Sequence, residues 1–194
     1  SKDLETATFG SGCFWCTESD FEKVPGVLKV VSGYTGGQGE NPTDHNYVAQ
    51  GHTEAVQVFY DPAQVTYAQL LDVFWRHIDP TDAGGQFLDR GPGYQSAIFY
   101  HDEEQRRLAE KSREAMAASG RFTKPIATRI VKLERFYDAE EYHQDYYRKN
   151  ALHYRVYRSG SGRDRFLEKA WAEGRGPGQA AGGRIYAKPD DSVL

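Results

Sequence analysis

The stretch ETATFGSGCFWC, residues 5–16, combines a strand-like pattern, a glycine turn and the only two cysteines of the chain, Cys13 and Cys16. Gly-Ser-Gly lets the backbone turn sharply from a strand at 5–9 into a helix that we expect over 13–24. Cys13 would then lie at the first helical turn, where free N–H groups and the helix dipole favour a thiolate. Cys16, one turn later, is placed to form a disulfide with an oxidised Cys13.

The Cys-x-x-Cys spacing by itself has several interpretations. We favour redox chemistry, either in a specific reductase or in a general thiol-disulfide oxidoreductase, and half of a zinc site or two buried thiols are the alternatives. A zinc site needs two further ligands, and the histidines form no closely spaced pair of the kind that zinc sites use, which weakens that alternative. The six histidines are His45, His52, His77, His101, His143 and His153.

The composition is that of a globular protein with a sizeable core, since 39% of the 194 residues are apolar and 27% are charged. No stretch approaches the roughly 18 consecutive apolar residues of a membrane span, which excludes a transmembrane protein. The formal net charge is −4, without the concentrated basic surface that nucleic-acid binding requires. The many aromatic side chains suit a small-molecule pocket.

The chain is expected to form one catalytic domain over residues 1–172, acting as a monomer, followed by a flexible, Gly-rich extension over 173–194. The N-terminus has neither an initiator Met nor an apolar signal region, as in a processed or trimmed chain. The sequence therefore leaves the compartment open between the cytoplasm, which we favour, and export of a mature form.

Strands and helices mix without a regular alternation, which favours an α+β fold. Further strands are predicted over 27–31, 54–60, 96–100 and 126–133, and loops over 32–51 and 79–94. Helices are predicted after the N-caps Thr66 and Asp102, from Asp138 to about 150, and from Asp164 to 171, with a turn at Ser159-Gly160-Ser161-Gly162.

Several separate motifs resemble one family, the type A peptide methionine sulfoxide reductases. They occur in the family's order over about residues 8–147, which is far more specific than the two cysteines alone. The motifs are Gly12-Cys13-Phe14-Trp15, Gly33-Tyr34-Thr35-Gly36-Gly37, Asn41-Pro42-Thr43, Gly51-His52-Thr53-Glu54-Ala55-Val56, Tyr60-Asp61-Pro62, Phe74-Trp75 through Asp79-Pro80, Asp89-Arg90-Gly91 with Tyr94, and Glu141 to Tyr146.

This resemblance implies a mainly antiparallel sheet flanked by helices, in a two-layer sandwich with a ferredoxin-like core. It implies reduction of the S epimer of methionine sulfoxide, free or in proteins, to methionine. Thioredoxin or another dithiol would supply the electrons, and neither a metal nor a bound organic cofactor is required. No nucleic acid or membrane partner is expected.

The resemblance also assigns an acid to the site. Glu54 matches the family's acid, which would protonate the sulfoxide oxygen while a thiolate attacks the sulfur. From the residues alone, a solvated glutamate at a strand edge is the better interpretation, and the family match reverses that preference. His52, close to Glu54, is expected to be structural or to form hydrogen bonds in its loop.

The remaining site residues come from the same motifs. Tyr94 matches a tyrosine that donates a hydrogen bond to the sulfoxide oxygen, and Asp89 matches an acidic residue that organises the pocket. A second such tyrosine normally follows Asn-Pro-Thr, but here that register is shifted, so Tyr47 is our candidate and His45 the alternative. Tyr146 is a candidate to close the pocket, with helix packing against Tyr142 as the alternative.

Two aromatic residues and the second cysteine complete the predicted site. Phe14 and Trp15 are candidates for the pocket wall, with ordinary helix-to-sheet packing as the alternative. Many members of the family recycle through cysteines in a C-terminal tail, whereas residues 151–194 contain none. Either Cys16 therefore resolves the sulfenic acid of Cys13, or an external thiol reduces that acid directly and Cys16 is incidental.

Overall fold

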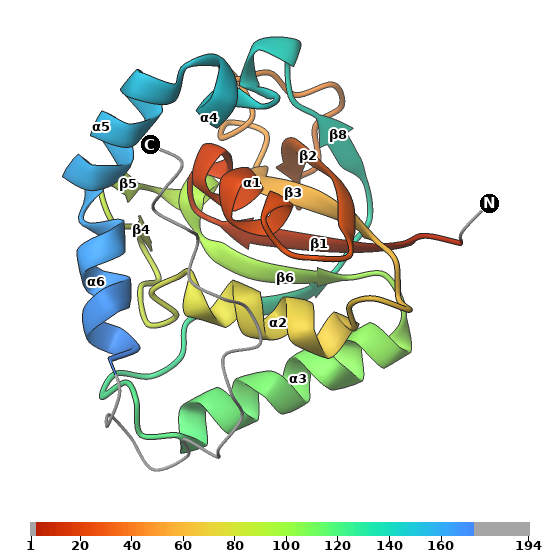
Figure 1. Ribbon diagram of the computed structural model, residues 1–194. Coiled ribbons are helices and arrows are strands. Elements are labelled where there is room, and N and C mark those ends of the chain that lie inside the picture. Colours follow the sequence, from red (N-terminus) through yellow and green to blue (C-terminus); the bar gives the residue numbers. More distant parts are fainter. Residues whose placement is uncertain (1–2, 173–194) are drawn as a thin grey trace.

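A computed structural model describes residues 3–172 (Figure 1). The predicted extension over 173–194 lies outside the described residues. The strands are β1 (Glu5–Ser11), β2 (Val27–Thr35), β3 (Thr53–Tyr60), β4 (Gly85–Gln86), β5 (Asp89–Arg90), β6 (Ser96–Tyr100), β7 (Arg129–Lys132) and β8 (Phe136–Asp138). The α-helices are α1 (Phe14–Glu22), α2 (Tyr67–Arg76), α3 (Glu103–Ala118), α4 (Tyr146–Lys149), α5 (Ala151–Ser161) and α6 (Arg163–Ala170), and the short 3₁₀ helices are η1 (Pro92–Tyr94) and η2 (Glu141–His143).

The main sheet has six strands in the order β7-β6-β1-β3-β2-β8. Every neighbouring pair is antiparallel except β6 and β7, which are parallel. This arrangement confirms the expected α+β fold with a mainly antiparallel sheet flanked by helices. The strands β1 and β3, which carry or adjoin the reactive motifs, are central, so both are held by hydrogen bonds on two sides.

The largest core cluster lies between the sheet and helices α1, α2 and α3. Alternate residues of β1 and β3 point into it, as Phe9 and Val56 do, while Ala55 belongs to a smaller cluster on the opposite face. Helices α2 and α3 run beside each other along the sheet, and α5 and α6 lie at one end of it (Figure 1). Within residues 3–172, no helix is both long and apolar enough to cross a membrane.

Local sequence signals located several boundaries correctly. Thr66 accepts a hydrogen bond from the Gln69 N–H and the Gln69 side chain returns one to Thr66, which confirms the predicted capping box. Asp102 caps α3 through the Gln105 N–H. The strand predicted over 96–100 coincides with β6.

The C-terminal third differs from the prediction. Asp138 does not cap a helix, because residues 136–138 pair with β2 as strand β8. The helical turn that follows is divided into η2 and α4, separated at Asp145, which has a left-handed φ of 55°. The predicted turn at 159–162 is also wrong, since α5 continues through Ser161 and ends only at Gly162, whose φ is 83°.

Candidate active site

The two cysteines lie where β1 turns into α1. Cys13 is the N-cap of the helix, and its carbonyl oxygen accepts hydrogen bonds from the N–H groups of Cys16 and Thr17, both at 3.2 Å. Gly12 has a φ of 85°, and a Cβ atom there would lie 2.6 Å from the Cβ of Gln86, so the turn requires glycine. Both thiols are free and buried, with exposed fractions of 5% for Cys13 and 0% for Cys16.

The charge on the pair is distributed differently from the prediction. Burial raises the pKa of the Cys13 thiol well above its usual value, and its hydrogen bond to Cys16 and the nearby carboxyl groups act in the same direction. That hydrogen bond and two arginines lower the pKa of Cys16 to about 7. Burial therefore opposes the thiolate of Cys13 that the helix N-terminus was expected to favour.

Glu54 lies beside Cys13 on the central strand β3. Its side chain is buried, so the alternative of a solvated glutamate at a strand edge is wrong. One carboxyl oxygen accepts a hydrogen bond from the Phe14 N–H at 3.1 Å, and the other accepts one from the Tyr47 hydroxyl at 2.9 Å. Burial raises the pKa of Glu54 to about 8, so the group holds a proton at neutral pH.

Tyr47 and Tyr94 extend this acidic group by two hydroxyls. Tyr47 is buried and stacks on Tyr34 with ring centroids 4.7 Å apart, and its hydroxyl is hydrogen-bonded to that of Tyr94. His45 belongs to the same loop, but it is exposed to solvent. Of the two candidates, the structure therefore brings Tyr47, and not His45, to the carboxyl group.

His52 holds the loop between β2 and β3 that carries Tyr47. Its Nδ1 atom accepts a hydrogen bond from the Gly37 N–H at 3.0 Å, and its Nε2 atom lies 2.6 Å from the carbonyl oxygen of Gly39. The prediction that His52 has a structural role in its loop is confirmed.

Asp89 approaches the cysteines from the β4–β5 hairpin. It is half-buried, which raises the pKa of its carboxyl group, and it accepts a hydrogen bond from the Tyr157 hydroxyl of α5. Both Asp89 and Glu54 contribute to the raised pKa of Cys13, which places the two carboxyl groups around that sulfur.

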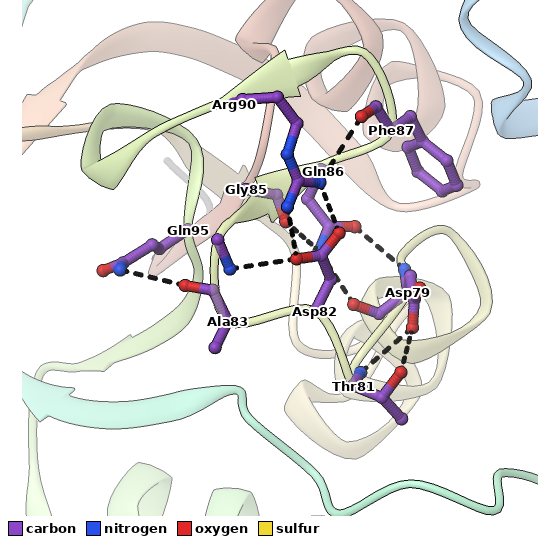
Figure 2. A network of polar contacts seen from close by, with 10 residues as sticks. Asp79, Thr81, Asp82, Ala83, Gly85, Gln86, Phe87, Arg90 and Gln95 are labelled. Carbon is purple, nitrogen blue, oxygen red and sulfur yellow. Dashed lines mark hydrogen bonds and ion pairs between the residues drawn. The ribbon is translucent and has the colours of Figure 1, made fainter.

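The hairpin that carries Asp89 is held by a network of polar contacts (Figure 2). The Gln86 side chain accepts a hydrogen bond from the Asp79 N–H at 2.8 Å and donates one to the Asp79 carbonyl oxygen at 2.7 Å. Arg90 forms a two-pronged ion pair with Asp82 across the hairpin. Because Gln86 also packs against Gly12, the network fixes the position of Asp89 relative to the cysteine turn.

Aromatic side chains line the outer part of the site. Phe14 packs in the main core against Tyr34 and His143, so its side chain serves the packing role, while its N–H contacts Glu54. Trp15 is half-buried and stacks on Tyr146, with ring centroids 3.8 Å apart, and it donates a hydrogen bond to His143 at 3.0 Å. Tyr146 thus packs on Trp15 and contributes to one wall beside the cysteines.

The cysteines do not lie in a metal-binding arrangement within the described part of the chain. The one group of three potential ligands found among residues 3–172 is Glu18, Glu22 and Asp145, and no cysteine belongs to it. The structure therefore gives no support to the zinc interpretation of Cys13 and Cys16.

Sequence reasoning missed the residues that cover Cys16. Tyr154 packs on both cysteines, and Tyr157, Arg158 and Arg163 surround them from α5 and α6. No local motif marks these residues, because their proximity to α1 arises from the way the last two helices fold back.

The chain is similar to known proteins both in sequence and in fold. The family model described as peptide methionine sulfoxide reductase matches residues 5–175. A peptide methionine sulfoxide reductase of Listeria innocua is 54% identical over 172 residues, which cover 88% of this chain and 97% of the relative.

Two solved structures of Mxr1 from Saccharomyces cerevisiae share the fold. The reduced form matches with a TM-score of 0.70 and 32% identity, over 76% of this chain and 86% of that one. Mxr1 in complex with Trx2 matches with a TM-score of 0.53 and 28% identity, over 74% of this chain and 84% of that one.

Proposed function

The chain belongs to the peptide methionine sulfoxide reductase family and reduces methionine sulfoxide to methionine, and we propose that it does so with Cys13 as nucleophile, Glu54 as acid and Cys16 as resolving thiol. The proposed substrate is the S epimer, free or in proteins. The observation that carries this mechanism is a buried carboxyl group that holds a proton at neutral pH beside a buried thiol.

In the first step the sulfur of Cys13 attacks the sulfoxide sulfur. A bond forms between the two sulfurs, the sulfur–oxygen bond of the substrate breaks, and the oxygen leaves as water. Water then attacks the sulfur of Cys13, the sulfur–sulfur bond breaks, methionine leaves, and Cys13 becomes a sulfenic acid, while the proton that this water releases restores Glu54. Two electrons thereby pass from the cysteine to the substrate. Glu54 donates a proton to the oxygen as it develops negative charge, and the proton released by the Cys13 thiol balances this transfer. We propose that the hydroxyls of Tyr94 and of Tyr47, which contacts Glu54 in the substrate-free protein, donate hydrogen bonds to the same oxygen when substrate is bound.

In the second step Cys16 attacks the sulfur of the Cys13 sulfenic acid. A disulfide forms, the sulfur–oxygen bond breaks, and the departing hydroxide takes up one proton to leave as water, which the proton lost by Cys16 balances. An external dithiol of the thioredoxin type then reduces the disulfide to two thiols. The solved complex of the related Mxr1 with Trx2 supports a donor of this kind.

The remaining pocket residues are proposed to hold the substrate. Asp89 orients the hairpin side of the site through Tyr157, while Trp15 and Tyr146 provide an apolar wall for the methyl group of the sulfoxide. Phe14 contributes mainly by holding Glu54 through its N–H.

A single-turnover experiment tests this assignment. Fully reduced protein is mixed with excess methionine-S-sulfoxide and no reductant, and methionine and remaining thiols are counted per chain. We expect one methionine and no remaining thiol. The Cys16→Ser variant should still form one methionine but accumulate a sulfenic acid on Cys13, and the Cys13→Ser variant should form none.

Other outcomes would change the assignment. One methionine with one thiol left in the unmodified protein would mean that an external thiol reduces Cys13 directly and that Cys16 is not the resolving residue. Turnover of sulfoxide by the Cys13→Ser variant would remove Cys13 as nucleophile. Reduction of insulin disulfides at a comparable rate would instead favour a general thiol-disulfide oxidoreductase.

A further inference from the structure

Two arginines lie near Cys16. Both come after residue 147, where the family motifs found in the sequence end. Arg158 belongs to α5 and Arg163 to α6, and both helices pack at the end of the sheet where β1 turns into α1 (Figure 1). The Arg163 residue is 1% exposed and the Arg158 side chain is 13% exposed. Burying a cation costs free energy of desolvation unless nearby polar or negative groups compensate it, so the presence of these arginines needs a physical reason.

Arg163 is held against the cysteine turn by neutral partners. It donates hydrogen bonds to the carbonyl oxygens of His77 at 2.8 Å and of Ser11 at 3.1 Å. One guanidinium nitrogen would lie 3.1 Å from a Cβ atom at Gly12, the residue before Cys13. These carbonyl groups fix the position of the guanidinium but do not neutralise it.

Arg158 is held by α1 itself. It donates a hydrogen bond to Asp20 at 2.7 Å and another to the Tyr154 hydroxyl at 2.9 Å, and Asp164 pairs with it on the outer side at 2.9 Å. Asp20 lies one helical turn after Cys16. Burial opposes its ionisation, but the cations led by Arg158 hold the pKa of Asp20 below its ordinary value.

Neutral and charged groups both face Cys16. Cys13 donates a hydrogen bond to Cys16, Arg163 and Arg158 stabilise its thiolate, and Asp20 opposes it. Tyr154 and Tyr157 also face the sulfur, and both are neutral because burial raises the pKa of each hydroxyl. The two arginines are therefore the cations of this environment.

We propose that Arg158 and Arg163 are positioning residues of the reaction, which hold a negative charge on Cys16 and thereby set the rate at which Cys16 closes the disulfide. This inference rests on the proposed role of Cys16. In the step concerned, the Cys16 thiolate attacks the Cys13 sulfur, the sulfur–sulfur bond forms, and the hydroxide that leaves takes a proton from the carboxyl group of Glu54 to become water. The proton that Cys16 loses earlier goes to solvent and later restores Glu54.

A spectroscopic titration tests the charge on Cys16 without catalysis. In a Cys13→Ser background, Cys16 is the only thiol, and its ionisation is followed by thiolate absorbance at 240 nm. We expect Arg163→Gln and Arg158→Gln each to raise the midpoint by about one pH unit, because each removes one nearby cation. Arg163→Lys and Arg158→Lys, which keep the charge, should stay close to the parent.

A rapid-quench experiment tests the consequence in protein with both cysteines. Disulfide formation after a single sulfoxide turnover should be about fivefold slower at pH 7 in each Gln variant, and its rise with pH should shift upward by about one unit. Arg148→Gln removes a cation whose side chain is 65% exposed on α4, and it should change neither measurement.

The possible results separate this inference from the proposed function. If the parent protein closes the disulfide and both Gln variants keep its midpoint and its rate, the arginines have no role in the step and the inference is overturned. If the parent forms no Cys13–Cys16 disulfide, the role of Cys16 fails, and the inference fails with it. If Arg158→Gln does not fold, Arg163→Gln alone tests the inference. Arg163 donates to carbonyl groups, so its replacement leaves no buried carboxylate without its ion-pair partner.

Discussion

The cysteine pair has two sides that are built from different parts of the chain and act in opposite directions. On the acid side, defined by Glu54, Tyr47, Tyr94 and Asp89, burial raises the pKa of Cys13 most, and the carboxyl groups of Glu54 and Asp89 add to this shift. On the arginine side, defined by Arg158 and Arg163, the hydrogen bond from Cys13 lowers the pKa of Cys16 most, and the two cations lower it further. The acid side comes from the sheet and its loops, and the arginine side comes from α5 and α6.

This difference corresponds to the two halves of the proposed reaction. Reducing a sulfoxide requires a proton donor close to the oxygen, so the surroundings of Cys13 favour neutral groups. Closing a disulfide requires a thiolate, so the surroundings of Cys16 favour negative charge. One helical turn separates the two sulfurs, and the elements packed on either side of α1 add to the contrast that burial and the Cys13–Cys16 hydrogen bond create.

The largest expected effect comes from disabling the acid side. Glu54→Gln keeps an acceptor for the Phe14 N–H but has no proton to give, and methionine formation in a single turnover should fall by about 10²–10³-fold. In the unmodified protein that rate should decline above about pH 8, where Glu54 loses its proton, and the variant should lack this decline. Glu103→Gln, an exposed control on α3, should match the unmodified protein. A rate within about threefold in Glu54→Gln would remove Glu54 as the acid.

The acid side should also reduce stability at alkaline pH. The pKa of Glu54 rises from its ordinary 4.5 to about 8 on folding, so the folded state retains a proton that the unfolded state loses. This contribution is complete below pH 4.5 and is lost as the pH rises through 8.

Glu54→Gln lacks that titration, so the variant should gain about 3–4 kcal/mol relative to the unmodified protein between pH 5 and pH 8. Urea unfolding at several pH values measures the difference, with Glu103→Gln as the control. A constant difference across this range would show that Glu54 does not change its pKa on folding.

The smallest expected effect on methionine formation comes from removing the Tyr47 hydroxyl from the acid side. Tyr47→Phe removes a hydroxyl that contacts both Glu54 and Tyr94, and methionine formation should fall about tenfold. His45→Ala alters an exposed residue of the same loop and should leave the rate unchanged. The opposite ranking of these two variants would transfer the oxygen-binding role from Tyr47 to His45.

Sequence reasoning succeeded where the physical cause is local. The turn at Gly12 needs a left-handed backbone, the capping box joins residues three apart, and the alternation in β3 repeats over a few residues. Helix α5 shows the opposite case, since Gly160 suggested a turn although the helix continues through it. Glycine disfavours a helix at this position, but Tyr154 and Tyr157 of the same helix pack against the cysteines.

By itself, the sequence determined the cysteine pair and the class of fold, because motifs and periodicities are properties of neighbouring residues, whereas Glu54 was predicted as the acid only through the family resemblance. The tertiary structure decided which residue of the 36–52 loop reaches Glu54, and it placed Tyr47 there while leaving His45 in solvent. It also decided the electrostatic surroundings of the two sulfurs. These surroundings depend on burial and on Arg158 and Arg163, which are far from Cys16 in sequence and reach it only through folding.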